Sequence, residues 1–249
     1  MLTSNESKSS LQTITLVHSG DDYFSRLVKM ILESKFEIHI QTYIFDYDST
    51  GKKIIEALKK AAAKNIKIYI LLDGFGSLSF PSEVIDELSK IGIDLRIFSP
   101  FLSANSLYIG RRLHHKIIVS DAKIALIGGI NIADKYRGTE KHGAWLDYAV
   151  EINDENIAKS LQELCSDIYF KNRIIRRKKI SSSYENSAIA SVSVLQNDWL
   201  KRKNEIFKAY INTIGNAKKE IVIVSSYFLP GKKLIKTLKK ASQNKVTIK

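Results

Sequence analysis

The chain has 249 residues, 44% of them apolar, which suits one large α/β domain or two smaller ones and excludes an intrinsically disordered protein. Its single cysteine, Cys165, excludes an internal disulfide and a multi-cysteine metal site, and it suits a reducing compartment. The net charge of +13 favours an anionic partner, either nucleic acid or an acidic membrane surface, over a merely lysine-rich soluble protein.

The first part of the chain predicts alternating strands and helices. Residues 37–45, EIHIQTYIF, alternate along the chain and predict a strand, residues 51–61, GKKIIEALKKA, predict an amphipathic helix, and residues 66–72 predict a second strand. Asp73 and Gly74 are interpreted as a structural turn after that strand. Residues 81–92 predict a helix that stops at Gly92, followed by a strand over residues 93–101.

The next segment, residues 111–131, reads RRLHHKIIVSDAKIALIGGIN and predicts a hairpin. A strand turns successive side chains to opposite faces, so His114 and Lys116 should share one face while His115, interpreted as a packing residue, points to the other. With Asp121 and Ala122 in the turn, Gly129 lies opposite His114. Asn131 follows just beyond, and histidine, lysine and asparagine together suit a phosphate group.

The later part of the chain repeats the first strand and helix. Residues 153–172 predict a long helix with an Asn or Asp cap, and residues 173–187, basic and then serine-rich, predict a connection. Residues 220–228, 231–241 and 246–249 then match 37–45, 51–61 and 66–72 at an offset of about 180 residues, which implies two similar halves. The counterpart of residues 111–131 would fall near position ~294, so we expect the chain to be truncated.

The fixed residues of the hairpin segment resemble the motif of the phospholipase D superfamily. The pattern is His114-x-Lys116, then Asp121, then Gly128-Gly129-x-Asn131. GGINIADKY, followed by Trp145 and Asp147, and the earlier TYIF and LLDGFGS are similar to bacterial cardiolipin synthases in particular. Many family members carry Ser where this chain has Gly129, which puts one hydroxyl donor in doubt.

The resemblance implies a phospholipase D-like α/β sandwich, a mixed β-sheet flanked by helices. We expect one complete domain over residues 1–178, a linker over 179–199, and the incomplete start of a second similar domain over 200–249.

The resemblance also implies roles for the site residues. His114 would be the nucleophile that forms a phosphohistidine, or the paired acid/base. Lys116 and Asn131 would hold a non-bridging phosphate oxygen, and Asp147 would orient His114. Asp121 would support the hairpin or a nearby cation. The substrate-binding candidates are Gly128, Gly129 and Tyr43, with a strand-end aromatic in the core as the equally weighted interpretation of Tyr43.

The leading hypothesis is a transferase that moves a phosphatidyl group between phosphatidylglycerol molecules, without cofactor or metal. Its partners would be an anionic phospholipid, a peripheral membrane surface, and either a second copy or a missing C-terminal half. With no apolar run of ~18 residues and no signal-peptide pattern at the start, we expect it on the cytoplasmic, inner face of a bacterial membrane.

Two alternatives stay open. One is a nuclease or phosphodiesterase of the same superfamily that acts as a dimer, although the second repeat and the lack of an aromatic-interleaved basic groove argue against nucleic acid. The other is a catalytically silent lipid-binding remnant. With a single His-x-Lys half-site in the chain, we expect the monomer to be inactive, because general acid help to the leaving group would be missing.

Overall fold

The computed structural model describes residues 13–100, 112–170, 194–195, 197–198, 203–225 and 227–249. It divides into two units, Met1–Lys179 and Ile180–Lys249. The basic stretch at 173–187 and most of the expected linker at 179–199 lie outside the described residues. Across the described ranges, no helix combines the length and the apolar character needed to cross a bilayer.

The first unit contains the expected strand–helix alternation as a parallel half-sheet. Strand β2 pairs with β3, and β3 pairs with β4, all in parallel. Helix α2 starts two residues before the Gly-Lys-Lys sequence, because the Asp48 carboxylate accepts the Gly51 N–H at 3.0 Å and caps the first turn. The elements are β2 Glu37–Thr42, α2 Ser49–Ala62, β3 Lys67–Asp73, α3 Ser82–Lys90 and β4 Ile93–Phe98.

Antiparallel strands complete a seven-stranded mixed sheet in the order β1-β7-β6-β5-β2-β3-β4. This confirms the expected α/β fold with a mixed sheet flanked by helices. The remaining elements of the unit are β1 Thr13–His18, α1 Asp21–Glu33, β5 Ile117–Ser120, β6 Ile124–Gly128, α4 Asp134–Arg137, β7 Tyr148–Asn153 and α5 Glu155–Tyr169.

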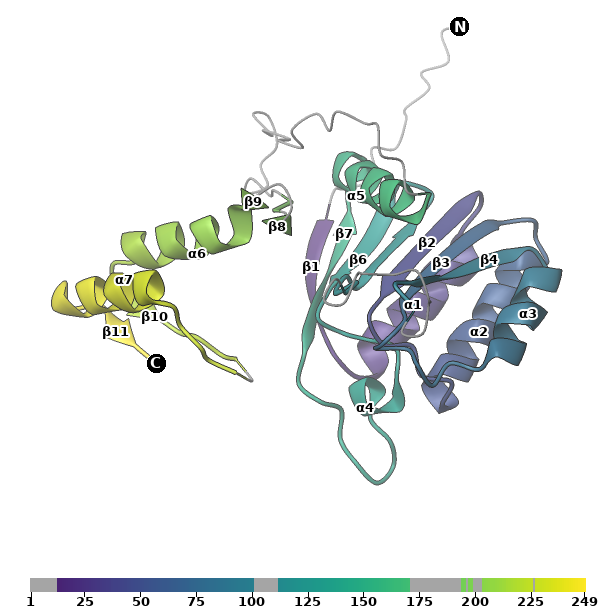
Figure 1. Ribbon diagram of the computed structural model, residues 1–249, viewed down its shortest axis with the longest axis horizontal. Helices are drawn as coiled ribbons and strands as arrows, with labels where there is room; N and C mark the ends of the chain where they lie inside the picture. The colour runs from purple at the N-terminus through teal and green to yellow at the C-terminus, as the bar shows by residue number, and fades with distance from the viewer. Residues whose placement is uncertain (1–12, 101–111, 171–193, 196, 199–202, 226) are drawn as a thin grey trace, which may run out of the picture. The chain divides into compact units, whose positions relative to one another are not determined.

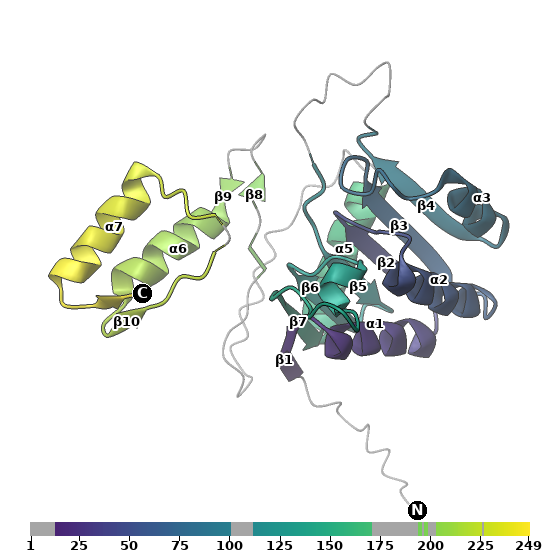
Figure 2. The ribbon, with the colours of Figure 1, turned by 90° about the horizontal axis from the view of Figure 1, so that it is seen from below.

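Helices cover both faces of this sheet. Helices α1, α2 and α3 lie on one face and α5 on the other (Figures 1 and 2). The alternation along β2 matches this arrangement: Ile38 and Ile40 are fully buried in the core shared with α1, α2 and α3. Gln41 faces α5 instead, where its side chain donates to the Cys165 carbonyl at 2.8 Å.

The β5–β6 hairpin differs from the predicted one by one residue in register. Asp121 and Ala122 occupy the turn with φ of 53° each, and the Lys123 N–H donates to the Ser120 carbonyl. The ladder nevertheless pairs Ser120 with Ile124, so three residues separate the paired positions. Gly128 therefore lies across from Lys116, where the predicted register had Ile127, and its N–H donates to the Lys116 carbonyl at 3.1 Å.

The second unit has the repeated strand–helix–strand, with short strands. Strands β10 and β11 pair in parallel, and α7 connects them, as in β2-α2-β3. A small core of Ile214, Ile221, Ala241 and Val246 holds α6 and α7 together. The bounds are β8 Asn197–Asp198, β9 Lys203–Asn204, α6 Glu205–Asn216, β10 Glu220–Ile221, α7 Lys232–Gln243 and β11 Thr247–Ile248.

Candidate active site

The sheet topology brings the motif residues to one end of the sheet. Tyr43 follows the last residue of β2, and residues 114–116 precede β5, which runs antiparallel to β2. Gly128 ends β6, and Asp147 precedes β7. Because each antiparallel neighbour reverses direction, these strand ends all lie at the same edge. Tyr43 and Asp147 are 104 residues apart in the sequence, and the fold brings these strand ends to one edge.

His114, Tyr43 and Lys116 form the centre of this site. The His114 imidazole stacks on the Tyr43 ring with centroids 4.5 Å apart and an interplanar angle of 26°. The Lys116 ammonium lies 5.2 Å from the centroid of the same ring and donates to the His114 carbonyl at 3.1 Å. Tyr43 therefore lies beside the motif, and an imidazole and an ammonium group share its surroundings.

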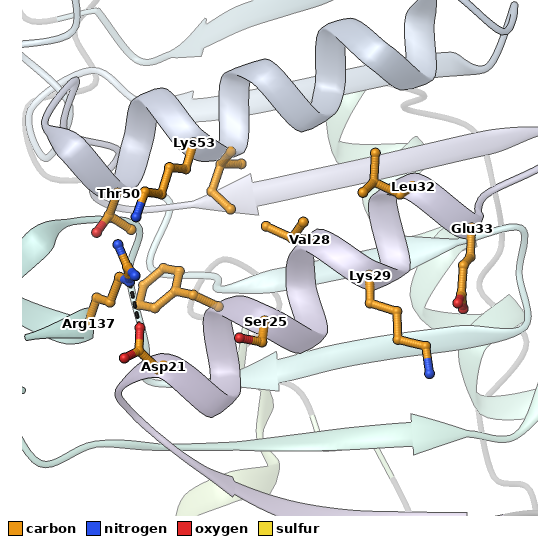
Figure 3. A pocket seen from close by; sticks show the side chains of 11 residues that line it. Asp21, Ser25, Val28, Lys29, Leu32, Glu33, Thr50, Lys53 and Arg137 are labelled. Atoms are coloured by element: carbon orange, nitrogen blue, oxygen red, sulfur yellow. Dashed lines mark hydrogen bonds and ion pairs between the residues drawn. The ribbon is translucent and has the colours of Figure 1, made fainter.

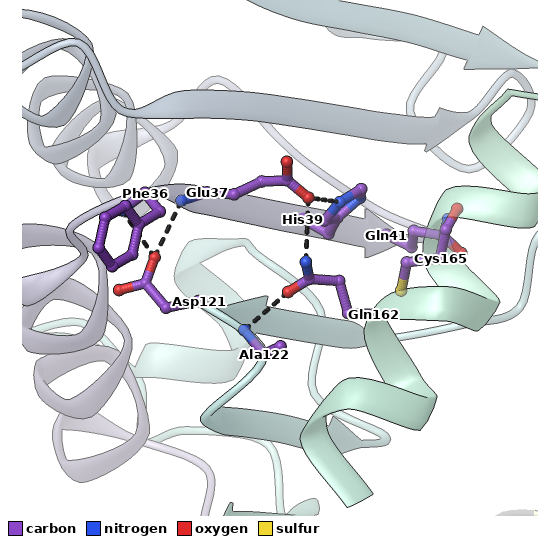
Figure 4. Close-up of polar contacts among 8 residues, drawn as sticks. All are labelled: Phe36, Glu37, His39, Gln41, Asp121, Ala122, Gln162 and Cys165. Carbon is purple, nitrogen blue, oxygen red and sulfur yellow. Dashed lines mark hydrogen bonds and ion pairs between the residues drawn. The ribbon is translucent and has the colours of Figure 1, made fainter. Parts of the chain in front are cut away.

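His115 points to the other side of the sheet. Its Nδ1 lies 3.2 Å from Oε1 of Gln41, the residue that bonds helix α5. This polar layer continues along β2, where His39 and Glu37 are 2.6 Å apart and Gln162 donates to Glu37 at 3.1 Å (Figure 4). His115 thus belongs to the packing between the sheet and α5, and His114 does not.

The charges at the site act on one another. Partial shielding from solvent and the neighbouring Lys116 ammonium lower the pKa of the largely exposed His114, and the Asp73 carboxylate opposes this change. Burial likewise lowers the pKa of Lys116, with Asp147 and Asp73 opposing. A lowered pKa favours the neutral imidazole, which is the form able to act as a nucleophile.

The Asn131 side chain is buried and forms hydrogen bonds with two protein groups. Its Oδ1 accepts the Ile44 N–H at 3.0 Å, and its Nδ2 donates to the Tyr136 hydroxyl at 2.7 Å. The first bond fixes the backbone directly after Tyr43. Asn131 therefore orders the segment that carries the stacked tyrosine, and an amide nitrogen has a second N–H in addition to the one given to Tyr136.

Asp147 lies against Gly129 and forms no hydrogen bond with the His114 ring in the described part of the chain. A Cβ on Gly129 would fall 2.1 Å from Oδ1 of Asp147, so the glycine leaves room for this carboxylate. Oδ1 accepts the Tyr148 N–H at 2.8 Å. A Cβ on Gly128 would likewise fall 2.3 Å from the Tyr148 carbonyl oxygen. Both glycines thus leave room for the segment that leads into and begins β7.

Asp121 lies at the opposite end of β5 from His114, which corrects its inclusion among the catalytic residues. Its carboxylate accepts three backbone N–H groups, those of Lys35, Phe36 and Glu37, at 2.8, 2.8 and 2.9 Å. It therefore fastens the hairpin turn to the segment before β2. A supporting role was one of the two that the sequence suggested, and no lysine or arginine side chain forms an ion pair with it among the described residues.

Asp73 is the residue whose place at the site the sequence did not reveal. It ends β3, is fully buried, and accepts the Leu113 N–H at 2.7 Å, one residue before His114. The turn expected at Asp73 and Gly74 is present, and the Asp73 carboxylate within it also bonds to the segment that carries the motif. A carboxylate that ends an apolar strand, as in IYILLD, was the available signal, because a buried charge needs partners.

The described residues contain no group of three or more His, Cys, Asp or Glu side chains placed to hold a metal ion. A groove of about 470 Å³ lies between α1 and α2 (Figure 3). Thr50, Lys53, Arg137 and Asp21 gather at one end, Val28 lies near the middle, and Leu32 lies toward the other end. None of the motif residues lines this groove, so it is separate from the site around His114.

Known sequences resemble nearly the whole chain. The family model "Cardiolipin synthase, PLD-like domain" matches residues 27–168. Cardiolipin synthase B of Escherichia coli (strain K12) is 30% identical over 241 residues, covering 95% of this chain and 58% of the relative. A cardiolipin synthase of Clostridium perfringens (strain SM101 / Type A) is 30% identical over 246 residues, with 95% and 51% covered. The chain therefore spans somewhat more than half the length of these relatives.

Solved structures share the fold. A phosphatidylserine synthase of Haemophilus influenzae Rd KW20 superposes with a TM-score of 0.71 at 15% identity, over 94% of this chain and 60% of that chain. A phospholipase D family member of Salmonella typhimurium superposes with a TM-score of 0.50 at 20% identity, over 64% and 95%. At these identities the likeness concerns the fold alone, whereas the family model covers more than half of the sequence. This chain belongs to the cardiolipin synthase PLD-like domain family.

Proposed function

We propose that the chain carries one half-site of a phosphatidyltransferase that moves a phosphatidyl group from one phosphatidylglycerol to a hydroxyl of another. The products are cardiolipin and glycerol. The observation that supports this most is the stack of His114 on Tyr43 beside the Lys116 ammonium, at the end of the sheet where the motif residues meet. An imidazole next to a fixed cation suits a phosphodiester anion.

In one assignment His114 is the nucleophile. Its neutral ring nitrogen forms a bond to phosphorus while the bond from phosphorus to the glycerol oxygen breaks, and a second histidine gives its proton to the departing oxygen. The hydroxyl of the second phosphatidylglycerol then attacks the phosphohistidine, passes its proton to the second histidine, and releases His114. In the other assignment His114 is the proton donor and acceptor, and the second histidine forms the covalent bond.

Lys116 and Asn131 stabilise the negative charge on the non-bridging phosphate oxygens in the transition state. The Lys116 ammonium acts as a point charge on a non-bridging oxygen, and the second N–H of the Asn131 amide donates to the same group. Asp147 acts through Lys116 in this proposal, because its charge counters the fall in the Lys116 pKa. No cofactor and no metal ion takes part.

The second histidine belongs to a second half-site. Of the other histidines, His39 is buried beside Glu37, and the His18 ring lies tilted against Tyr148 with centroids 4.6 Å apart, so neither contacts Lys116 or Tyr43. The second half-site would come from a longer form of the protein, in which residues 200–249 start a second similar domain, or from a second copy of the chain. A monomer of residues 1–249 would then not turn over.

The lipid substrate places the reaction at an anionic membrane surface, on the cytoplasmic face of a bacterial membrane. The net charge of +13 supports this placement. Exposed lysines on two helices add local positive charge: Lys52, Lys53 and Lys60 on α2, and Lys232, Lys233, Lys236, Lys239 and Lys240 on α7. Each cation near such a surface contributes ~1 kcal/mol before screening.

The test is lipid conversion in phosphatidylglycerol vesicles, with products identified by mass spectrometry. Fractions are separated by size and their mass is measured by light scattering, so that one and two half-sites are distinguished. We expect cardiolipin from preparations with two half-sites, with His114→Ala inactive and His115→Ala retaining substantial activity. If preparations with two half-sites form no cardiolipin and no hydrolysed lipid, the proposal is contradicted. Repeated turnover by a monomer contradicts the need for a second histidine.

The nuclease alternative is tested in the same preparations. A nuclease of this superfamily would cleave DNA without metal, with activity that falls steeply as salt rises. DNA cleavage that is lost in His114→Ala, without lipid conversion, would replace the proposed substrate while keeping the site. Lipid conversion without DNA cleavage eliminates the alternative.

A further inference from the structure

We infer that Asp73 is a positioning residue for His114. From the end of β3 it fixes the backbone at Leu113, and it thereby holds the His114 imidazole against Tyr43. The catalytic consequence rests on the proposed function, whereas the positioning itself concerns this chain's own residues and can be measured without turnover.

The Asp73 carboxylate is buried and accepts hydrogen bonds through both oxygens. It has 0% exposure, and its Oδ1 accepts the N–H groups of Phe75 and Gly76 at 2.9 and 3.0 Å. Its Oδ2 accepts the Leu113 N–H at 2.7 Å. A buried carboxylate is costly unless its oxygens are hydrogen-bonded. The first two bonds belong to a local turn, and the third reaches 40 residues along the chain to the segment that carries the motif.

The segment before β5 depends on this third bond. Strand pairing starts only near Lys116, whose carbonyl accepts the Gly128 N–H, so residues 112–115 lie outside the ladder. Leu113 is buried with Leu71 and Tyr169, which anchors its side chain, and Asp73 anchors its backbone. His114 comes next and stacks on Tyr43. Two anchors on one residue therefore determine where the adjacent imidazole lies.

The same carboxylate also contributes charge. Besides the partial burial that lowers the His114 pKa most, two charged groups act on it: Lys116, which lowers it, and Asp73, which raises it. Asp73 likewise raises the pKa of Lys116. Asp73 thus partly offsets the ammonium beside the imidazole, in addition to holding the backbone.

The chain offers a matched control in Asp121. That carboxylate also accepts three backbone N–H groups, at the opposite end of the sheet from His114. In the test, the variants Asp73→Asn and Asp121→Asn are compared by NMR of their histidine ring protons. The His114 signals are assigned by their loss in His114→Ala. Stacking on a tyrosine shifts these protons upfield, and Tyr43→Leu provides the unstacked reference.

We expect the His114 ring signals of Asp73→Asn to move toward the Tyr43→Leu reference, while Asp121→Asn leaves them in place. Unchanged signals in Asp73→Asn, or equal displacement in both variants, would overturn the inference. Thermal unfolding of each variant separates loss of global stability from loss of the stack.

A measurement on the unaltered chain covers the case in which Asp73→Asn does not fold. The Leu113 amide should exchange with solvent roughly ten- to hundredfold more slowly than the His114 amide, for which the structure has no acceptor among the described residues. Equal exchange of the two amides contradicts the inference. The vesicle assay tests the proposed function separately, since these NMR results need no lipid.

Discussion

At the scale of single residues, the titration of His114 reports the charges around it. The Lys116 ammonium lowers the pKa of His114, so replacing it with an uncharged side chain should raise that pKa. We predict that Lys116→Met raises the pKa of His114, as measured by histidine NMR between pH 4 and 9. If the neutral imidazole is the nucleophile, a variant with a raised His114 pKa should lose activity at a higher pH on the acidic side of its pH–activity profile.

Lys123 provides the control for this titration. It lies in the hairpin turn at the other end of β5, where it is 63% exposed and 4.0 Å from Glu155. Lys123→Met removes the same charge and should leave the His114 titration unchanged. An unchanged pKa in Lys116→Met, or the same rise in both variants, would mean that Lys116 is not the cation that the imidazole senses.

At the scale of elements, the approach of β7 to β6 determines what residue 128 can be. A Cβ on Gly128 would fall 2.3 Å from the Tyr148 carbonyl oxygen and 2.5 Å from the Ala149 Cα, and neither backbone atom can yield without separating the strands. We predict that Gly128→Ala lowers the free energy of unfolding by about 1–3 kcal/mol in urea denaturation. Gly143→Ala, where a Cβ meets nothing within 4 Å, is the control and should be nearly neutral. Equal stability of both variants would argue against this strand spacing.

The polar layer between β2 and α5 should make the fold sensitive to acid. Burial lowers the pKa of His39 although Glu37 opposes it, and the unfolded value is about 6.5. Because the folded pKa is the lower one, the neutral imidazole's contribution to stability is fully present above the unfolded pKa. It is lost as the pH falls from there through the folded pKa.

The measurement is the urea midpoint at pH 8 and at pH 5. We predict that the drop between them is smaller in His39→Gln, which keeps a donor for Glu37 but does not titrate in this range. His142→Gln, in the exposed 138–144 loop, should behave like the unaltered chain. An identical drop in His39→Gln would show that other groups carry the acid sensitivity.

At the scale of the whole molecule, the two units differ in how much core they contain. The second unit buries four apolar residues in its cluster, whereas α1, α2, α3 and the sheet share a far larger core. A small core supports little stability. We predict that peptides from α6 and α7 exchange amide hydrogens faster than peptides from α2 and α5, as measured by mass spectrometry. Equal protection would mean that the second unit is stabilised by more than this cluster.

Local patterns predicted most of the first unit. The period-two runs at β2, β3 and β4 and the helical spacing in α2 and α3 are strong because one face of each element is buried. The capping residue Asp154 was also readable, and it accepts the N–H groups of Asn156 and Ile157. The motif spacing predicted the residues around His114 because it repeats a family pattern, not because sequence alone places side chains.

What the sequence could not reveal depends on contacts between distant residues. Three bonds of Asp121 to residues 35–37, and one of Asp73 to Leu113, join parts of the chain 40 to 86 residues apart. The predicted hairpin register is wrong by one residue, because Ser120 pairs with Ile124 across three residues and turn propensity alone does not determine the turn length. Strand β1 was not expected at all, since it is defined by its pairing with β7.

The most direct measurement of the site is the His114 ring signal during titration with short-chain phosphatidylglycerol, which needs only one half-site. We predict a saturable shift of the His114 signals and a rise in the His114 pKa on binding, because the phosphodiester anion stabilises the charged imidazole. Lys116→Met should weaken both effects, and His115→Ala should preserve them. Unchanged His114 signals at lipid concentrations that shift other resonances, or an identical response in Lys116→Met, would contradict the assignment of this site to phosphatidyl transfer.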